Sequence, residues 1–320
     1  MPIIDEVTTR FVESPADMPL LIPGGARPEG PQRIVSGVGV GLAIRYLRLV
    51  RATGAAFACI LALVSAPVFA HADACGDDLD GRRVACRCGD TVVSDTRLAG
   101  SDPVVTTRCT LDGLTIRARD LAESIRVDLN GQVLRGSGVG NGVLVVYGGT
   151  DGAQLVGAAA PAYGTIADFG IGLAANRGES LARVEQIELR DNREEGVRVK
   201  LAGTVFENVI AHGNARDGFH LLGKGGRLAG VRSYENGENG IRLFATDVVV
   251  GASADHNARS GIIVDGEDND LDAAEASANG RDGIVIRGSG GAMEVLRAES
   301  NARDDIRLNG KPPPLAEESR

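Results

Sequence analysis

The sequence predicts an all-β protein, a single-stranded right-handed parallel β-helix solenoid with coils of about 22 residues. The first observation is a repeated pattern, Asn-x-x-x-Gly-apolar-x-apolar. The second is its period, because successive copies start 22, 22, 21, 22 and 22 residues apart. The third is a spacing of two between apolar, often β-branched residues, which is typical of strands that face a core. The copies begin at Asn192, Asn214, Asn236, Asn257 and Asn279, with a degenerate copy at Asn301.

Stacking these copies predicts the residues of the core. Two apolar files lie two residues apart and two more follow along each coil, so each coil is expected to hold about three short strands. Neighbouring coils then pair in parallel, and parallel crossover connections are almost always right-handed. The files are Val197, Phe219, Ile241, Ile262, Ile284 and Ile306; Val199, Leu221, Leu243, Val264, Ile286 and Leu308; Phe206, Leu228, Val250, Leu271 and Met293; and Ile187, Val209, Val231, Ala252, Ala274 and Leu296.

The turns carry a pattern of their own. We expect the repeated asparagines to hydrogen-bond from coil to coil as a structural ladder, and the repeated glycine to supply a backbone conformation that other residues rarely adopt. Turns at Gly142 and Gly170 predict looser upstream coils of about 28 and 26 residues. Downstream, Asp305 replaces the glycine and three prolines begin at Pro312, so the solenoid is predicted to stop at Leu308.

The segment before the repeats predicts export. Arg45, Arg48 and Arg51 precede an apolar run at 54–70, which ends in Ala-His-Ala before Asp73, as in a secretory signal peptide. An uncleaved signal anchor and a buried core helix are the alternatives. We therefore expect a periplasmic or secreted protein. Its predicted organisation is 1–43 disordered or untranslated, 44–72 signal peptide, 73–124 disulfide-containing N-terminal cap, 125–308 parallel β-helix and 309–320 C-terminal tail.

Four cysteines remain after signal cleavage, Cys75, Cys86, Cys88 and Cys109. An even number in an exported domain predicts two disulfides, for which four cysteines allow three pairings. We favour Cys75–Cys86 together with Cys88–Cys109. Metal binding by the Cys-x-Cys pair is the alternative, although common zinc sites use a Cys-x-x-Cys spacing.

Composition excludes some partners. A net charge of −9 and a pI near 5.1 argue against nucleic acid, because phosphate contacts need clustered Lys and Arg. The chain has no tryptophan, which removes the ring platforms that many sugar sites use. After signal cleavage we expect no membrane association, and we expect a monomer.

The repeats resemble those of bacterial right-handed parallel β-helix repeat proteins of the pectate-lyase-like superfamily. That superfamily also contains polygalacturonases, alginate epimerases and periplasmic copper-site maturation proteins. The local likeness is strongest at residues 127–138, after a Cys-Gly-Asp-Thr segment that begins at Cys88. The resemblance covers about Cys75 to Leu308. It implies the fold and a link to carbohydrate, but several chemistries share this scaffold.

The motifs of the catalytic relatives are not found. The nearest pieces of a polygalacturonase-like set are Asp304-Asp305 and His212-Gly213, and the only Asp-Pro, at Asp102, lacks the His-Glu of an epimerase-like element. The three methionines and four histidines form no cluster that would favour copper. We therefore expect a carbohydrate-binding or structural surface module without catalysis. The alternative is a polysaccharide lyase or epimerase that acts on an acidic glycan.

One outward file suggests a binding site. Between the two inward files, the outward strand position holds Arg198, His220 and Arg242, followed by Ile263 and Val285. Three basic or titratable groups about 4.8 Å apart on one sheet could bind the carboxylates of an acidic polysaccharide. A solvated surface is the alternative interpretation.

An acidic run contains Asp268, Asp270 and Asp272. Calcium takes several oxygen ligands, so these carboxylates are a weak candidate for a calcium site. Ala273 stands where a calcium loop needs glycine, and no glutamate closes the loop. We expect no metal and no other cofactor, and calcium is the ion to test.

Overall fold

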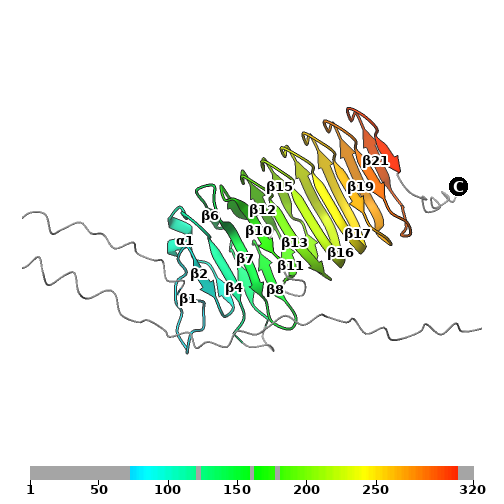
Figure 1. Cartoon of the computed structure of the whole chain (residues 1–320). Helices are drawn as coiled ribbons and strands as arrows, with labels where there is room; N and C mark the ends of the chain where they lie inside the picture. The colour runs from blue at the N-terminus through cyan, green and yellow to red at the C-terminus, as the bar shows by residue number, and fades with distance from the viewer. Residues whose placement is uncertain (1–72, 120–123, 159–161, 177–180, 309–320) are drawn as a thin grey trace, which may run out of the picture. The chain divides into compact units, whose positions relative to one another are not determined.

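The computed structural model describes residues 73–119, 124–158, 162–176 and 181–308. Within these ranges the chain winds into a solenoid whose coils stack in sequence order, from the cyan strands β1 and β2 to the orange and red strand β21 (Figure 1). The named strands pair in parallel along three ladders, which we call the first, second and third face. The predicted parallel β-helix is therefore confirmed.

Each face collects one strand segment from each coil. The first face contains β1 (Ala74–Cys75), β2 (Asp90–Val92), β4 (Leu114–Arg117), β7 (Asn141–Tyr147), β10 (Ile171–Ala175), β13 (Val197–Ala202), the starts of β16 (Phe219–Tyr234) and β17 (Ile241–Asp255), β18 (Ile262–Asp265), β20 (Ile284–Arg287) and β22 (Ile306–Leu308). The second face contains β3 (Thr96–Arg97), β5 (Arg126–Asp128), β8 (Ala153–Val156), β11 (Leu181–Glu185), β14 (Val205–Glu207), the middles of β16 and β17, and the start of β19 (Asp270–Ser277). The third face contains β6 (Val133–Arg135), β9 (Gly164–Ala167), β12 (Ile187–Arg190), β15 (Ile210–His212), the ends of β16, β17 and β19, and β21 (Leu296–Glu299). One short helix, α1 (Pro103–Thr106), is described.

The four predicted apolar files form the core. Up to Ile286, every member of the first two files is at most 7% exposed. Their last members, Ile306 and Leu308, are each 41% exposed, because no described coil follows them. Val285 corrects our expectation that it faces solvent, since it is only 1% exposed. Its register partner is Arg307, whose Nη1 lies 3.7 Å from Oδ2 of Asp282, three residues before Val285.

The predicted asparagine ladder is present at the turn before the first face. Each side-chain oxygen accepts a backbone N–H and a side-chain N–H from the asparagine one coil earlier; for example, Asn214 Nδ2 donates to Asn236 Oδ1 at 3.0 Å. The ladder ends where Asn301 Nδ2 donates to Asp305 Oδ1 at 2.9 Å. Because the interior asparagines are at most 2% exposed, these bonds satisfy amides that water does not reach.

The repeated glycine is needed for space rather than for an unusual backbone, which corrects our expectation. Gly240 does not have a positive φ, yet a Cβ there would lie 2.7 Å from both Asn257 Nδ2 and the Gly261 carbonyl oxygen. The left-handed residue of each turn is instead the one just before the ladder asparagine. These residues are Asp191, Gly213, Glu235, His256, Ala278 and Ser300, with φ between 52° and 63°.

The upstream coils have different lengths from those predicted. Val143 lies opposite Leu173 and Leu173 opposite Val197, so the register advances by 30 and then by 24 residues. Gly172, and not Gly170, is the equivalent of the repeated glycine, since the Leu173 N–H bonds to the carbonyl of Gly196. We misplaced the turn by two residues because both glycines precede an apolar residue.

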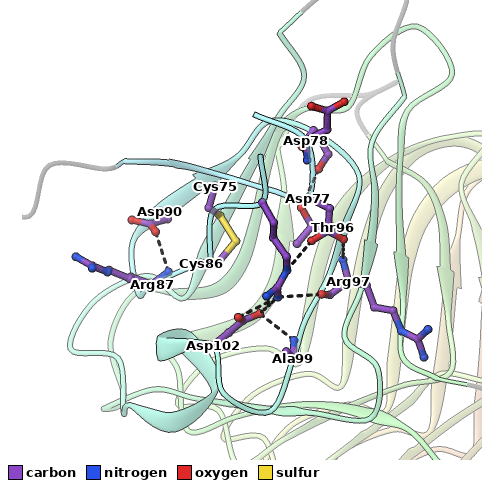
Figure 2. The surroundings of a disulfide bond; sticks show 12 residues. Cys75, Asp77, Asp78, Cys86, Arg87, Asp90, Thr96, Arg97, Ala99 and Asp102 are labelled. Carbon is purple, nitrogen blue, oxygen red and sulfur yellow. Dashed lines mark hydrogen bonds and ion pairs between the residues drawn. A yellow bond between two sulfur atoms is a disulfide. The ribbon is translucent and has the colours of Figure 1, made fainter. Parts of the chain in front are cut away.

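Two disulfides cross-link the N-terminal end of the described solenoid. The disulfides are Cys75–Cys86 and Cys88–Cys109, which confirms the favoured pairing. Figure 2 shows the Cys75–Cys86 bond above Asp102, a carboxylate 1% exposed that accepts bonds from Arg83 and from the Ala99 N–H (2.8 Å). The strands of this segment join the same ladder as the later coils, since β2 pairs with β4 and β4 with β7.

Several predicted segments lie outside the described residues. These are the segments 1–43 and 44–72, including the signal peptide, and the tail 309–320 with its prolines. No helix in the described part of the chain is long and apolar enough to cross a membrane.

Candidate functional site

The predicted strip lies on the first face in the expected register. Arg198 on β13 pairs with His220 on β16, which pairs with Arg242 on β17. Their side chains are partly exposed, at 31%, 22% and 36%. The repeat therefore brings these three residues into one line.

Two buried carboxylates, which the sequence analysis missed, lie beside this strip. Glu195 and Asp217 are 1% and 2% exposed and occupy equivalent places on successive coils. Arg198 donates to Glu195 at 2.5 Å and to Glu194 at 2.9 Å. His220 Nδ1 lies 3.8 Å from Glu195 Oε1 and 4.0 Å from Asp217 Oδ2. The strip is thus one side of a mixed-charge cluster.

Two more arginines complete the cluster. Arg216 Nη1 lies 3.4 Å from Glu195 Oε1, and Arg242 Nη1 lies 3.8 Å from Asp217 Oδ2. The Arg242 guanidinium also lies over the Phe244 ring, 4.7 Å from its centroid. Three arginines therefore meet three carboxylates, so the cluster is electrically balanced apart from its histidine.

The cluster holds Glu195 in its charged form. Burial, the largest single influence, disfavours the carboxylate, but the nearby His220 ring and the attraction of Arg198 and Arg216 act against it. The pKa of Glu195 is lowered as a result. A buried carboxylate that stays ionised and bound to arginine serves as an ion-pair partner and is a poor proton acceptor for a ligand.

The acidic run is not gathered into one site. Asp270 Oδ1 accepts the Ala292 N–H at 2.6 Å, Asp272 lies 3.9 Å from Arg227, and Asp268 occupies a left-handed turn position. Among the residues that the structure describes, no three His, Cys, Asp or Glu side chains are grouped so that they could hold a metal ion.

A second polar cluster, also missed by the sequence analysis, lies on the third face. Glu188 Oε1 on β12 is 3.0 Å from His212 Nε2 on β15, and Thr165 Oγ1 on β9 donates to Glu188 Oε2 at 2.9 Å. The Tyr234 ring, at the end of β16, stacks on the His212 ring with centroids 4.7 Å apart and planes 7° apart. Four successive coils therefore build one supported aromatic platform.

The Tyr234 phenol remains protonated at neutral pH. Burial raises its pKa, and the nearby Glu188 carboxylate raises it further, while Arg232 opposes both. The Arg232 guanidinium lies 5.8 Å from the centroid of the same ring. Tyr234 thus offers an aromatic surface and a neutral hydroxyl.

A groove runs from this platform toward the C-terminal coils. A hollow of about 310 Å³ is lined by Arg232, Tyr234, Asp255, His256 and Ser277. Within it, Ser277 Oγ donates to Asp255 Oδ1 at 2.8 Å. A second hollow of about 510 Å³ shares Asp255 and Ser277 and is also lined by residues as far as Ile306. We call these two neighbouring hollows, which share Asp255 and Ser277 in their lining, the third-face groove; they present hydroxyl, carboxylate, guanidinium and aromatic groups.

The 22-residue period of the sequence already indicated which residues line up along this groove. The register places Arg190, His212, Tyr234, Asp255 and Ser277 in one outward file, two residues before the ladder asparagine. We predicted a binding site from the outward file of the first face only. Extending the same 22-residue offset to His212 would have joined it to Tyr234.

Comparison with known proteins agrees with the fold. A family model described as a right-handed β-helix region matches residues 169–305. The chain is therefore a right-handed parallel β-helix repeat protein. No curated protein sequence matches it significantly. Among solved structures, it is similar to the enzymatically active domain of tailspike protein 2 of bacteriophage CBA120, with 11% identity and a TM-score of 0.38, over 70% of this chain and 42% of that chain.

Proposed function

We propose that this protein is an exported, non-catalytic surface module that binds carbohydrate in the third-face groove. The observation that carries the proposal is the hollow beside Tyr234. There an aromatic ring adjoins the donor Arg232, the acceptor Asp255 and the hydroxyl of Ser277. Sugars expose both C–H faces and hydroxyl groups, and a concave site with a ring and a few placed polar groups suits both.

The first-face strip supports binding less well. Its cations Arg198 and Arg242 already contact carboxylates, so an acidic polysaccharide would have to replace those contacts. The groove includes Asp255, whose charge disfavours an anionic sugar at that place. We therefore propose a neutral saccharide for the groove, and the acidic polysaccharide on Arg198, His220 and Arg242 is the competing proposal.

Affinity measurements against neutral and acidic polysaccharides test the two surfaces together. Tyr234→Ala should weaken binding of a retained neutral polysaccharide at least tenfold, whereas Phe244→Ala, which removes an aromatic ring beside the strip, should leave it unchanged. If only acidic polysaccharides are retained, and Phe244→Ala weakens binding while Tyr234→Ala does not, the binding site is the first-face strip. If no polysaccharide is retained, the protein is a structural spacer.

Export is tested by the mature chain itself. The disulfides support an oxidising compartment. Protein recovered from the periplasm or medium should begin near Asp73, and its mass should rise by four hydrogens on reduction. A chain that keeps residues 1–72, or that has four free thiols, would contradict export.

A lyase or epimerase is the second candidate, favoured by the Glu188–His212 pair. A histidine held by a carboxylate is a common arrangement for a general base. Because a lyase product absorbs in the ultraviolet, incubation with pectate, alginate and glycosaminoglycans, with and without calcium, tests it. Absorbance that grows with the parent and not with His212→Gln would establish catalysis.

A further inference from the structure

The C-terminal end of the described solenoid is open. Ile306 and Leu308 are each 41% exposed, although the other members of their apolar files are buried. Val295 is also 41% exposed. β22 pairs with β20 and β21 pairs with β19, which leaves the outer edges of both strands without a described partner strand. An apolar end with free strand edges is a surface that proteins normally cover.

The described part of the opposite end is more closed. Cys75, Leu98 and Val104 are fully buried and Cys86 is 1% exposed, and Val84, at 39%, is the one large apolar residue of the described segment 73–104 that is exposed. A head-to-tail stack of copies would need an apolar surface at both ends. The arrangement that covers one open end with an identical copy is a closed two-fold dimer.

The edge strand β21 is complementary to itself. Its outward residues Arg297 and Glu299 flank Ala298, so antiparallel pairing about Ala298 sets Arg297 opposite Glu299 of a second copy, twice per dimer. Both side chains are exposed, and within one copy Arg297 Nη1 also lies 3.4 Å from Glu275 Oε1. The chain carries −9 overall, so a charge-matched edge is where two copies can approach with the least repulsion.

We propose that the C-terminal end of the solenoid is an interface at which a second copy of this chain binds through β21 and β22 about a two-fold axis. This replaces the monomer expected from the sequence. Because the second hollow of the third-face groove is lined by Leu296, Glu299 and Ile306, the axis near Ala298 would join the grooves of the two copies end to end. The interface itself does not depend on what the groove binds.

Light scattering after size-exclusion chromatography of the full chain tests the proposal. The parent should show twice the monomer mass, and Leu308→Arg should return it to the monomer mass because it adds a charge to each half of the apolar contact. Ile263→Arg, an outward substitution on the first face away from the end, is the matched control and should remain a dimer. Circular dichroism checks that each variant is folded.

A charge exchange tests the pairing of β21. Arg297→Glu alone should weaken the dimer at least tenfold, and adding Glu299→Arg should restore it to within threefold. A monomeric parent, a dimer that survives Leu308→Arg, or an exchange that fails to restore the dimer would overturn the proposal. If deletion of 309–320 converts a monomeric parent into a dimer, the tail and not a second copy covers the end.

Discussion

Replacing Asn236 by alanine should destabilise the solenoid strongly. Asn236 Oδ1 accepts the backbone N–H and a side-chain N–H of Asn214 at 3.1 and 3.0 Å, and the two N–H groups of Asn236 Nδ2 face three acceptors, on Ala211, Ser233 and Asn257, at 3.2, 3.1 and 3.0 Å. Alanine leaves two buried donors of Asn214, and the acceptors served by Asn236 Nδ2, without this partner. Since a buried polar group left unpaired costs about 1–3 kcal/mol, and local relaxation recovers part of that, we expect a loss of about 3–5 kcal/mol.

The matched control is Asn301→Ala at the end of the same ladder. Asn301 makes equivalent bonds to Asn279, but its site is partly exposed and water can replace the lost partners, so we expect a loss under about 1 kcal/mol. Urea unfolding followed by far-ultraviolet circular dichroism, with the disulfides intact, gives both values. Equal losses in the two variants would refute the idea that burial of the ladder sets its energetic value.

Ile241→Asp puts an unpaired charge at a fully buried position and should unfold the middle coils in a denaturant titration, while Ile263→Asp on the outward side should shift the midpoint little. Because the folded pKa of Glu195 is lowered, its contribution to stability is complete above the ordinary glutamate pKa and is lost as pH falls below about 4.3, so Glu195→Gln should flatten the acid limb of a stability-versus-pH curve. If the first-face strip binds an acidic polysaccharide, Arg198→Ala with Arg242→Ala should abolish retention on a column of that polymer; unchanged retention of the double variant places the binding elsewhere.

The periodic part of the fold could be predicted because each coil repeats the same environment. Burial at Phe219, Ile241 and Ile262 follows from one pattern observed several times. The irregular coils were harder, since a single copy cannot show which of Gly170 and Gly172 holds the repeated position. Val285 was misjudged for a different reason, because the alternation of a strand predicts the direction of its side chain and not whether neighbouring coils cover it.

The candidate sites were less accessible to sequence reasoning. The line of Arg198, His220 and Arg242 could be predicted from the period. The Glu195 carboxylate beside it could not, because the equivalent turn positions of other coils include asparagine and serine. A glutamate there is long enough to reach the strip. The stacking of Tyr234 on His212 likewise depends on ring orientation, which a residue pattern does not specify.

The asparagine ladder also has an electrical direction. Every side-chain amide receives a proton donor from the coil before and offers its own N–H to the coil after, so the amide dipoles add along the axis as peptide dipoles do in an α-helix. The row begins at the Phe169 N–H, and its positive end lies at Asn301, whose backbone and side-chain N–H groups both donate to Asp305 Oδ1. Asp305, the one residue that breaks the glycine pattern, places a carboxylate there as a countercharge. A solenoid truncated after an earlier ladder asparagine should therefore keep its stability per coil only if an aspartate follows the new last asparagine by four residues.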